Sequence, residues 1–212
     1  MAAGRHPIFA RVYTRVRPAM DRQGALAYRR RLLAGLSGRV VEVGAGDGGN
    51  FAFYPPEVTG VLAVEPESYL RQQATSRAAV APVPVEVVEG VADRLPVADG
   101  SADAAVASLV LCSVPDQGAA LAELRRVLRP GGELRFFEHV AADTPGLRRV
   151  QAVADRTLWP RVLAGCHTGR DTVAAIAAAG FAVEEVDRFR FPEGGLPAPA
   201  SPHVLGRARR TA

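Results

Sequence analysis

The chain has 212 residues, 48% of them hydrophobic and 23% charged, which suits one globular domain with its own core and does not require a second. No apolar run approaches the roughly 18 residues of a membrane span, and the N-terminus lacks the apolar segment and cleavage site of a signal peptide. The net charge of +4 is uneven, because residues 1–39 hold nine arginines and one acid.

Residues 1–37 are predicted to form a basic, amphipathic helical arm. Five apolar side chains recur there at helical spacing: Ile8, Phe9, Val12, Tyr13 and Val16. Arg11 and Arg15 fall on the other side of this helix. Pro18 is predicted to end it, and a second helix is predicted from Gln23 to Leu36, terminated by Gly38. Such an arm is either a solvated helix face or a contact surface for an anionic partner.

Residues 38–212 alternate between strand and helix patterns. Strands are predicted at Arg39–Val43, Gly60–Val64, Val85–Val88, Asp103–Leu111, Glu133–His139, Phe181–Phe191 and His203–Arg209. Helices are predicted at Asn50–Tyr54, Pro66–Ala78, Asp116–Leu128, Leu147–Leu163 and Asp171–Ala179. This order predicts an α/β fold with a doubly wound, mostly parallel, seven-stranded sheet. The last two strands are expected to add an antiparallel pair at one edge.

The segment Val40–Asn50, which reads VVEVGAGDGGN, joins the first predicted strand to the following helix. Glycines at such a turn let the backbone approach a ligand, and free N–H groups at a helix start can bind it. Glu65 ends the second predicted strand, 19 residues after Gly46. Its carboxylate is expected to accept hydrogen bonds from the two ribose hydroxyls of an adenosine.

Nicotinamide-binding domains use a similar loop, so the glycines alone do not identify the ligand. Three features favour S-adenosylmethionine. Glu42, two residues before the first glycine, can help to hold the positively charged methionine end. Asn50 and Phe51 stand where the dinucleotide motif has its final small residue. The turn RVLRPGG at 126–132 is also unusual in dinucleotide-binding domains.

With these motifs the chain, from about Leu36 to its end, resembles class I methyltransferases. A closer similarity lies in NFAFYPP at 50–56, VADGS at 97–101, LVLCSV at 109–114 and FEHVAA at 137–142, continued by Trp159 and Gly165-Cys166. These segments resemble the methyltransferase-like 7 family, whose animal members are thiol S-methyltransferases. Those relatives begin with a hydrophobic membrane anchor, whereas this sequence has the basic arm.

The resemblance implies a set of residues that contact S-adenosylmethionine. They are Glu42, Gly44, Ala45, Gly46, Gly48, Asn50, Glu65, Pro66, Ala92, Asp93, Leu109 and Val110. The three glycines would line the methionine and ribose, and Pro66 and Glu67 would border the adenine. The wider superfamily often has an adenine-binding Asp where this chain has Val91, so the Ala92 amide or Asp93 is expected to replace it.

Methyl transfer from a sulfonium is a direct displacement, so the protein chiefly aligns the reacting atoms. His139 is the candidate general base, or else a hydrogen-bonded support of the strand end. Asp155 and His167 are weaker candidates. Cys112 has no histidine close in sequence, which favours a small buried hydrophobic residue over a nucleophile. A thiol, with a pKa of about 8.5, is partly ionised near neutrality and needs a dedicated base less than an alcohol does. The absence of an obvious catalytic motif is therefore compatible with a thiol acceptor.

Two further placements stay open in the sequence. Phe9 and Tyr13 either cap the cofactor or pack the arm, and Trp159 is either a wall of the acceptor pocket or core. Two cysteines, Cys112 and Cys166, are too few for a disulfide framework, and no CxxC or Cys/His cluster indicates zinc. We therefore expect no metal and a reducing, cytoplasmic setting.

The partner is expected to be a small-molecule acceptor, with no nucleic acid. Contact with an anionic membrane through the arm is an open alternative. Two other functions also remain open: N-methylation of phosphatidylethanolamine at a membrane surface, and cofactor binding without catalysis.

Overall fold

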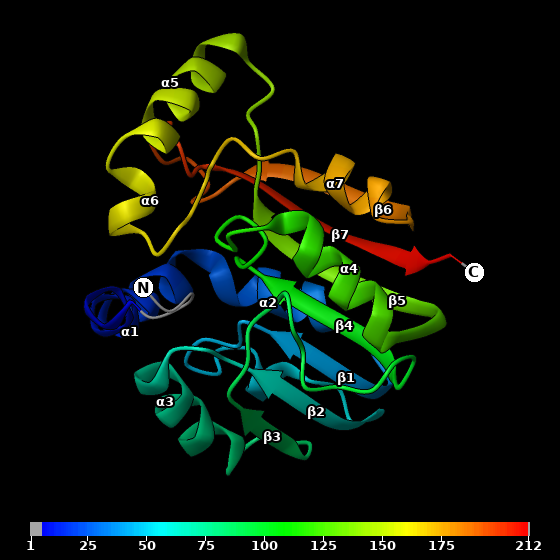
Figure 1. Ribbon diagram of the computed structural model, residues 1–212. Coiled ribbons are helices and arrows are strands. Elements are labelled where there is room, and N and C mark those ends of the chain that lie inside the picture. Colours follow the sequence, from blue (N-terminus) through cyan, green and yellow to red (C-terminus); the bar gives the residue numbers. More distant parts are fainter. Residues whose placement is uncertain (1–5, 212) are drawn as a thin grey trace.

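Strand β1 (Gly38–Val43) lies inside a seven-stranded sheet with the order β3-β2-β1-β4-β5-β7-β6 (Figure 1). The computed structural model describes residues 6–211. The other strands are β2 (Val58–Val64), β3 (Val85–Val88), β4 (Ala102–Ser108), β5 (Leu128–His139), β6 (Phe181–Arg190) and β7 (Pro202–Arg210). Strands β1 to β5 pair in parallel, whereas β7 is antiparallel to both β5 and β6. The predicted doubly wound sheet with its antiparallel edge is confirmed.

Helices cover both faces of the sheet. Successive side chains of a strand point to opposite faces, and in β1 apolar side chains are buried on both faces. On one face Val41 and Val43 pack with α4 (Gln117–Val127) and α7 (Thr172–Ala178). On the other face Val40 packs with α2 (Leu26–Leu33) and α3 (Ser68–Ala78). The central strands are therefore apolar on both sides. Strand order reverses between β1 and β4, which is where sheets of this type bind ligands.

The N-terminal helix departs from the sequence-based prediction. Helix α1 (Pro7–Met20) continues through Pro18, so the prediction that Pro18 ends it is wrong. A proline removes one backbone N–H donor, and here the chain goes on into a π-helical turn, Asp21–Ala25, with a kink at Gly24. Helix α2 ends at Leu33, before the predicted Leu36, because Ala34 leaves helical geometry with a ψ of +130° and Gly35 follows with a φ of +74°.

Two other predicted elements are divided or shortened. The predicted helix at 147–163 is two helices, α5 (Pro145–Arg156) and α6 (Trp159–Val162), because Thr157 leaves helical geometry with φ −113° and ψ −126°. The predicted helix at 50–54 is a single 3₁₀ turn, Phe51–Phe53. Strand β4 stops at Ser108 instead of residue 111, since Leu109 has a φ of +60°.

Helix α2, from the predicted arm, packs into the core of the sheet. The Tyr28 ring lies parallel to the Phe189 ring, with centroids 4.2 Å apart, and it also stacks on Phe137. Leu32 and Leu33 are fully buried. Within the described residues no helix is both long and apolar enough to cross a membrane.

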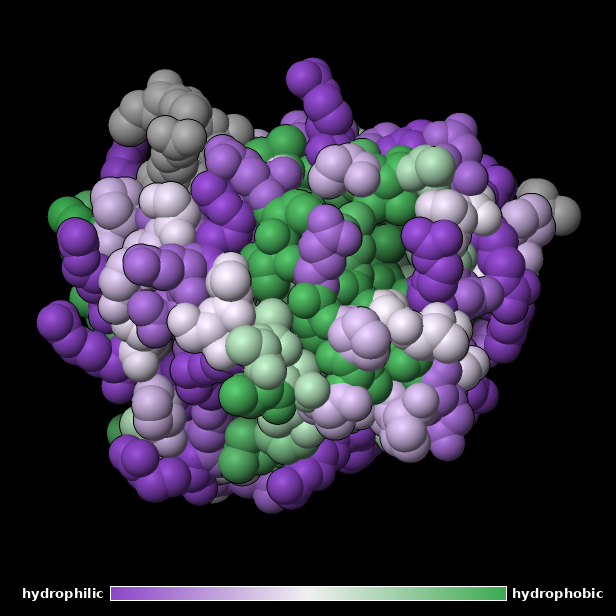
Figure 2. All heavy atoms as spheres, turned by 90° about the horizontal axis from the view of Figure 1, so that it is seen from below, coloured by the Kyte–Doolittle hydropathy of each residue, from purple (hydrophilic) through white to green (hydrophobic). Residues whose placement is uncertain are grey.

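The β3 edge of the sheet is only partly covered. Val85, Val87 and Val88 are half-buried there, and Glu86 points to solvent. Figure 2, which views the molecule from below, shows apolar side chains gathered near the centre of that face and polar side chains around them. The short strand and the charged residues limit pairing with another chain at this edge.

Replacement of Gly206 by alanine should destabilise the protein. Gly206 lies in β7 between two paired strands, and a Cβ there would overlap the Glu185 carbonyl oxygen and the Phe136 ring. We expect Gly206→Ala to lower the free energy of unfolding by about 1–3 kcal/mol, measured by urea titration. Gly146→Ala is the matched control, since a Cβ at Gly146 meets nothing within 4 Å. Equal urea midpoints for the two variants would contradict the packing described here.

Candidate active site

The loop after β1 is shaped by three glycines that no other residue replaces easily. Gly44, Gly46 and Gly48 have φ angles of +61°, +58° and +79°, which L-amino acids with side chains rarely adopt. A Cβ at Gly44 would lie 2.5 Å from Val110 Cγ2. The loop therefore passes close to the residues that follow β4, so the structure brings together two predicted parts of the cofactor site.

Glu42 supports this loop from beneath. One carboxylate oxygen accepts a hydrogen bond from Asn50 Nδ2 at 2.7 Å, and the other accepts one from the Tyr54 hydroxyl at 2.8 Å. Arg29 Nη1 completes the network by donating to Asn50 Oδ1 at 2.9 Å. Burial raises the pKa of Glu42 to about 7, although the bonds from Tyr54 and Asn50 oppose that shift. Direct contact of Glu42 with the methionine end stays a prediction.

Glu65, at the end of β2, lies against the glycine loop. Its Oε2 accepts a hydrogen bond from Gly46 N at 2.8 Å, and its Oε1 accepts one from Glu67 N at 2.9 Å. Burial raises the pKa of Glu65, and the two backbone N–H groups lower it. A carboxylate has about four acceptor positions, so two remain for a ligand. Glu65 is thus oriented at the edge where the sequence places the ribose.

The predicted adenine-binding residues lie in the loop after β3. Ala92 is half-buried against the α4 face of the core, and Asp93 is exposed. A Cβ at Gly90 would lie 2.7 Å from Val64 Cγ1, so this loop runs beside the carboxyl end of β2. Pro66, which follows Glu65, accepts a hydrogen bond from Arg71 Nη1 through its carbonyl oxygen at 2.9 Å.

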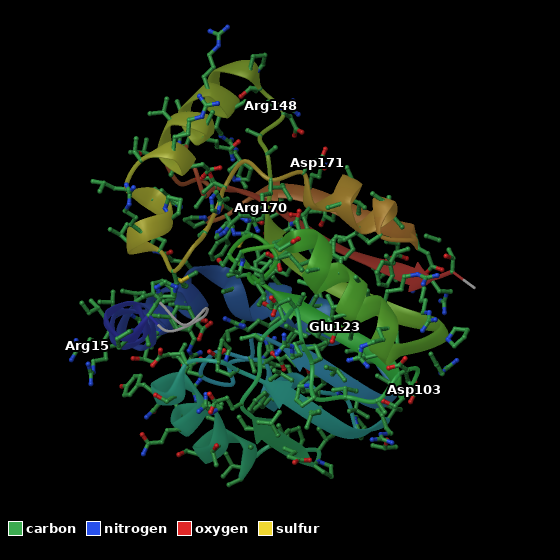
Figure 3. All side chains as sticks on the ribbon, viewed as in Figure 1. Arg15, Asp103, Glu123, Arg148, Arg170 and Asp171 are labelled. Carbon is green, nitrogen blue, oxygen red and sulfur yellow. The ribbon has the colours of Figure 1, made fainter. Side chains whose placement is uncertain are left out.

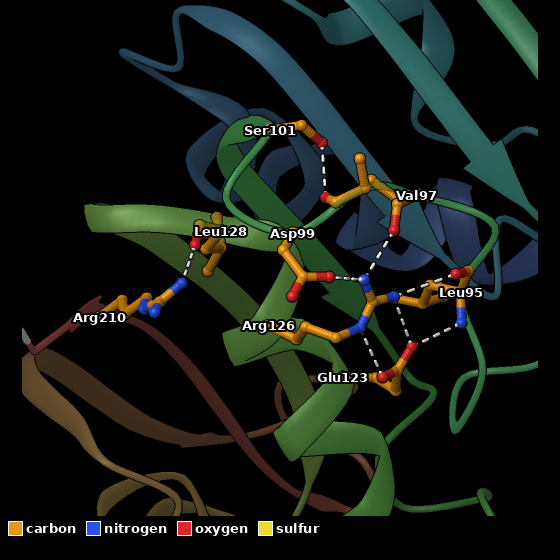
Figure 4. A network of polar contacts seen from close by, with 9 residues as sticks. Leu95, Val97, Asp99, Ser101, Glu123, Arg126, Leu128 and Arg210 are labelled. Carbon is orange, nitrogen blue, oxygen red and sulfur yellow. Dashed lines mark hydrogen bonds and ion pairs between the residues drawn. The ribbon is translucent and has the colours of Figure 1, made fainter.

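The chain beyond this loop is held by Arg126, which the sequence analysis did not single out (Figure 4). Its guanidinium donates to the carbonyl oxygens of Leu95 and Val97, at 3.1 and 2.8 Å, and to Asp99 Oδ1 at 2.6 Å. Glu123 accepts from Arg126 and from Leu95 N, both at 2.8 Å. This pair fastens the 95–99 segment to α4.

Glu138, at the end of β5, holds the turn after β4. Its carboxylate accepts hydrogen bonds from the backbone N–H groups of Val110, Leu111 and Cys112, at 2.9, 2.9 and 3.1 Å. Glu138 is fully buried, and burial raises its pKa against the effect of the three donors. No local motif predicts this role for Glu138, although the adjacent Glu138 and His139 mark the end of a predicted strand.

Arg170 secures the same turn from the opposite side. It donates from Nη1 to the carbonyl oxygens of Leu111 and Val114, at 2.7 and 2.8 Å. Figure 3 shows Arg170 within the fold near α4, whereas Arg15 lies on the outer side of α1. The turn that contains Val110 is therefore held beside the glycine loop, and contact of Leu109 and Val110 with the sulfonium stays a prediction.

His139 lies between two cysteines. Its Nδ1 is 3.5 Å from Cys112 Sγ and 3.5 Å from Cys166 Sγ. The pKa of Cys166 is lowered to about 5, chiefly by a hydrogen bond with Cys112, with smaller effects of His139 and Trp159, while that of Cys112 is raised. Cys112 is buried, as predicted, and although no histidine lies close to it in sequence, His139 at the end of the neighbouring strand β5 contacts it.

The other candidate acid–base residues have structural partners. Asp155 accepts hydrogen bonds from the backbone N–H groups of Thr168 and Gly169, at 2.8 and 2.9 Å. His167 Nδ1 lies 2.7 Å from the Gly165 carbonyl oxygen. Both residues shape the 163–171 segment, and neither belongs to the cluster around His139.

The basic arm folds over the glycine loop, which the sequence left open. Asp47, within the loop, is buried and pairs with Arg17 Nε at 2.7 Å and with Arg77 Nη1 at 2.9 Å. The Tyr13 ring stacks on the Phe9 ring. It also lies against the glycine loop, because a Cβ at Gly46 would be 3.7 Å from a carbon of the Tyr13 ring. In Figure 1 helix α1 accordingly lies on the side to which β1 and β2 point.

Comparison with known proteins agrees with this geometry. A family model described as a methyltransferase domain matches residues 41–136. Human thiol S-methyltransferase TMT1B is 37% identical over 181 residues, which cover 83% of this chain and 73% of that protein. Human thiol S-methyltransferase TMT1A is 36% identical over 182 residues, covering 82% of this chain and 72% of that protein.

Solved structures show the same fold. A methyltransferase from Thermotoga maritima, described as a possible histamine N-methyltransferase, has a TM-score of 0.69 at 23% identity and covers 96% of this chain and 98% of its own. A geranyl diphosphate methyltransferase in complex with S-adenosylmethionine has a TM-score of 0.67 at 16% identity and covers 89% of this chain and 85% of its own.

Fold, glycine loop and comparisons together define a class I, S-adenosylmethionine-dependent methyltransferase that acts on a small molecule. Within that class, the chain belongs to the family of the thiol S-methyltransferases TMT1A and TMT1B.

Glu65→Gln should weaken binding of S-adenosylmethionine by about 1–3 kcal/mol, because an amide replaces a charged acceptor beside the ribose position. Isothermal titration calorimetry measures the change in dissociation constant. Glu86→Gln, an exposed change on β3, is the control and should bind normally. An unaltered dissociation constant in folded Glu65→Gln would remove this residue from the cofactor site.

Glu42→Gln should reduce the pH dependence of stability between about pH 5 and pH 7. The pKa of Glu42 is about 7 in the folded protein, above the value of about 4.3 for an unfolded chain. The folded state therefore binds more protons in this window, and its stability falls as pH rises towards 7. Urea midpoints at pH 5, 6 and 7 should fall less in the variant than in the wild type. If the urea midpoints of the variant and the wild type change equally with pH, the raised pKa of Glu42 is contradicted.

Proposed function

We propose that this enzyme methylates the sulfur of small thiols. The observation that carries the proposal is the His139 ring between Cys112 and Cys166, beside the turn that borders the glycine loop. A site rich in sulfur and imidazole accommodates a soft, partly ionised thiol without a strong base. The relatives TMT1A and TMT1B, named as thiol S-methyltransferases, support the same acceptor.

The reaction is a single displacement. The thiolate sulfur attacks the methyl carbon, and a new S–C bond forms as the bond from that carbon to the cofactor sulfur breaks. The electron pair stays on the cofactor sulfur, which leaves neutral S-adenosylhomocysteine and a methyl thioether, and the proton of the thiol is released. The protein contributes mainly by alignment.

The residues that bind the cofactor are assigned from their positions. Gly44, Ala45, Gly46, Gly48 and Asn50 would line the methionine and ribose. Their support is the positive φ of the three glycines and the Glu42–Asn50 hydrogen bond beneath the loop.

The remaining cofactor contacts follow from the neighbouring strand ends. Glu65 would bind the ribose, and Pro66, Ala92 and Asp93 would border the adenine. Leu109 and Val110 would flank the sulfonium, because the turn that Glu138 holds lies against Gly44.

His139 is the candidate proton acceptor for the incoming thiol. Its ring is half-buried, its Nδ1 faces both cysteines, and it lies at the carboxyl end of β5. Because a thiol ionises on its own near pH 8.5, the need for such a base should vanish at high pH.

A panel of acceptors with isotopically labelled S-adenosylmethionine tests the proposed function. We expect transfer to alkyl thiols, aryl thiols and hydrogen sulfide, and little transfer to amines and phenols. His139→Asn should lower kcat by up to about 30-fold at pH 7, because only about one thirtieth of a thiol of pKa about 8.5 is ionised there, and by less as pH passes the pKa of the thiol. His167→Asn is the control for this segment. Methylation of amines or phenols but of no thiol would refute the proposal.

We also propose that α1 contacts anionic membrane surfaces peripherally. Ile8, Val12 and Val16 are 80%, 48% and 45% exposed on this helix, and Arg11 is exposed nearby. An apolar strip flanked by arginines suits an interfacial helix. Deletion of residues 1–37 would also remove α2 from the core, so surface substitutions give the sharper test.

The triple variant Ile8→Ser, Val12→Ser, Val16→Ser should float with anionic vesicles about tenfold less than the wild type, because three apolar contacts are lost. Val80→Ser, which changes a residue that is 83% exposed beyond α3, is the control. Wild-type protein that fails to float with anionic vesicles, or floats equally with neutral ones, would remove the membrane contact.

A further inference from the structure

Three side chains from separate segments direct metal-ligating atoms at one point. They are Cys112 after β4, His139 at the end of β5 and Cys166 in the segment before α7. Sγ of Cys112, a ring nitrogen of His139 and Sγ of Cys166 all lie within 4.8 Å of one another, and among the residues described this is the one group of three such side chains that could hold a metal ion. In sequence Cys112 and Cys166 each lie 27 positions from His139, which is why no local spacing indicates the site.

The two nitrogen–sulfur distances fit a tetrahedral zinc ion. Zinc binds sulfur at about 2.3 Å and histidine nitrogen at about 2.0–2.1 Å, which places a nitrogen and a sulfur ligand about 3.6 Å apart. The two nitrogen–sulfur distances are 3.5 Å. A Cys₂His set has three protein ligands, and catalytic zinc sites keep the fourth position open for water or substrate.

We propose that Cys112, His139 and Cys166 bind a zinc ion whose fourth coordination position receives the sulfur of the acceptor. The metal site is inferred from this geometry alone. The role of the fourth coordination position rests on the proposed thiol methylation.

The surroundings hold the ligands in place. The Cys112 backbone is fixed at both ends, because its N–H donates to Glu138 at 3.1 Å and its carbonyl oxygen accepts from His167 N at 2.8 Å. A Cβ at Gly165 would lie 2.7 Å from the Ser113 carbonyl oxygen, so the Cys166 segment docks closely on the Cys112 turn. Outer contacts of this kind orient metal ligands.

The arrangement leaves one side for a substrate. Cys112 and Cys166 are buried, at 1% and 5% exposure, whereas His139 is only half-buried. Glu138 does not compete as a ligand, because three backbone N–H groups occupy its carboxylate. Cys112 follows Val110 by two residues in the turn that Glu138 holds, so the cluster lies next to the turn that borders the glycine loop.

In this arrangement the thiol loses its proton to solvent on coordination, and its sulfur keeps the electron pair that attacks the methyl carbon. His139 is then a metal ligand, and no separate proton acceptor is needed. Loss of activity in His139→Asn is common to both roles, so metal content and not activity distinguishes them.

The test is the zinc content of the full-length protein, purified with reductant and zinc and then dialysed against metal-free buffer. We expect about one zinc per chain in the wild type, and affinity lowered at least about tenfold in Cys112→Ser, Cys166→Ser and His139→Asn. His167→Asn, whose ring nitrogen faces the Gly165 carbonyl oxygen, should retain zinc. Circular dichroism establishes that each variant is folded.

Cobalt substitution supplies a second readout. Co²⁺ in the wild type should show thiolate charge-transfer absorption and the visible bands of a tetrahedral site, and a small thiol should change those bands. If the small thiol leaves the Co²⁺ spectrum unaltered, the proposal that the fourth coordination position receives the acceptor sulfur is wrong. Wild-type protein without zinc, or with zinc retained in all three ligand variants, would overturn the site. Two thiols that titrate only after reduction would assign the cysteines to a disulfide instead.

The metal site and the proposed function can fail separately. Zinc binding without methyl transfer to any thiol would support the metal site and refute the proposal that the acceptor is a thiol. Methylation of thiols by zinc-free protein, unaffected by a chelator, would support the thiol acceptor and refute a catalytic role for zinc.

Discussion

Backbone N–H groups at the carboxyl ends of parallel strands must find acceptors, and in this protein buried carboxylates supply them. Glu138 accepts three such bonds from the turn after β4, and Glu65 accepts two, from Gly46 and Glu67. Each carboxylate is costly to bury alone, but the bonds offset that cost and fix a loop in one shape. The ligand edge of the sheet is therefore rigid where a sulfonium and a nucleophile must be aligned.

The N-terminal arm combines two functions that its sequence does not separate. Helix α2 completes the core through Tyr28, while α1 lies over the glycine loop through the Arg17–Asp47 ion pair. An arm that is attached at both places cannot be removed without disturbing the core. The same helix that covers the glycine loop also exposes the apolar strip proposed to meet a membrane.

The sulfur and imidazole cluster shows how this fold builds a site. Cys112 and His139 come from the ends of neighbouring strands, and Cys166 arrives on the long connection to α7. In a parallel sheet such ends converge at one edge whatever their distance in sequence. The cluster therefore unites three residues that no local motif connects.

By itself the sequence determined the class of fold, the succession of strands and helices along the chain and the glycine loop with Glu65, because hydrophobic period, glycine and charge are local properties. It also indicated the family through short motifs.

Only the tertiary structure decided that α1 passes Pro18, that Glu42 and Glu138 face inward, and that Cys112 has a histidine partner. The physical reason is that hydrogen bonds and ligand atoms meet across strand ends, where distance along the chain carries no information about distance in space.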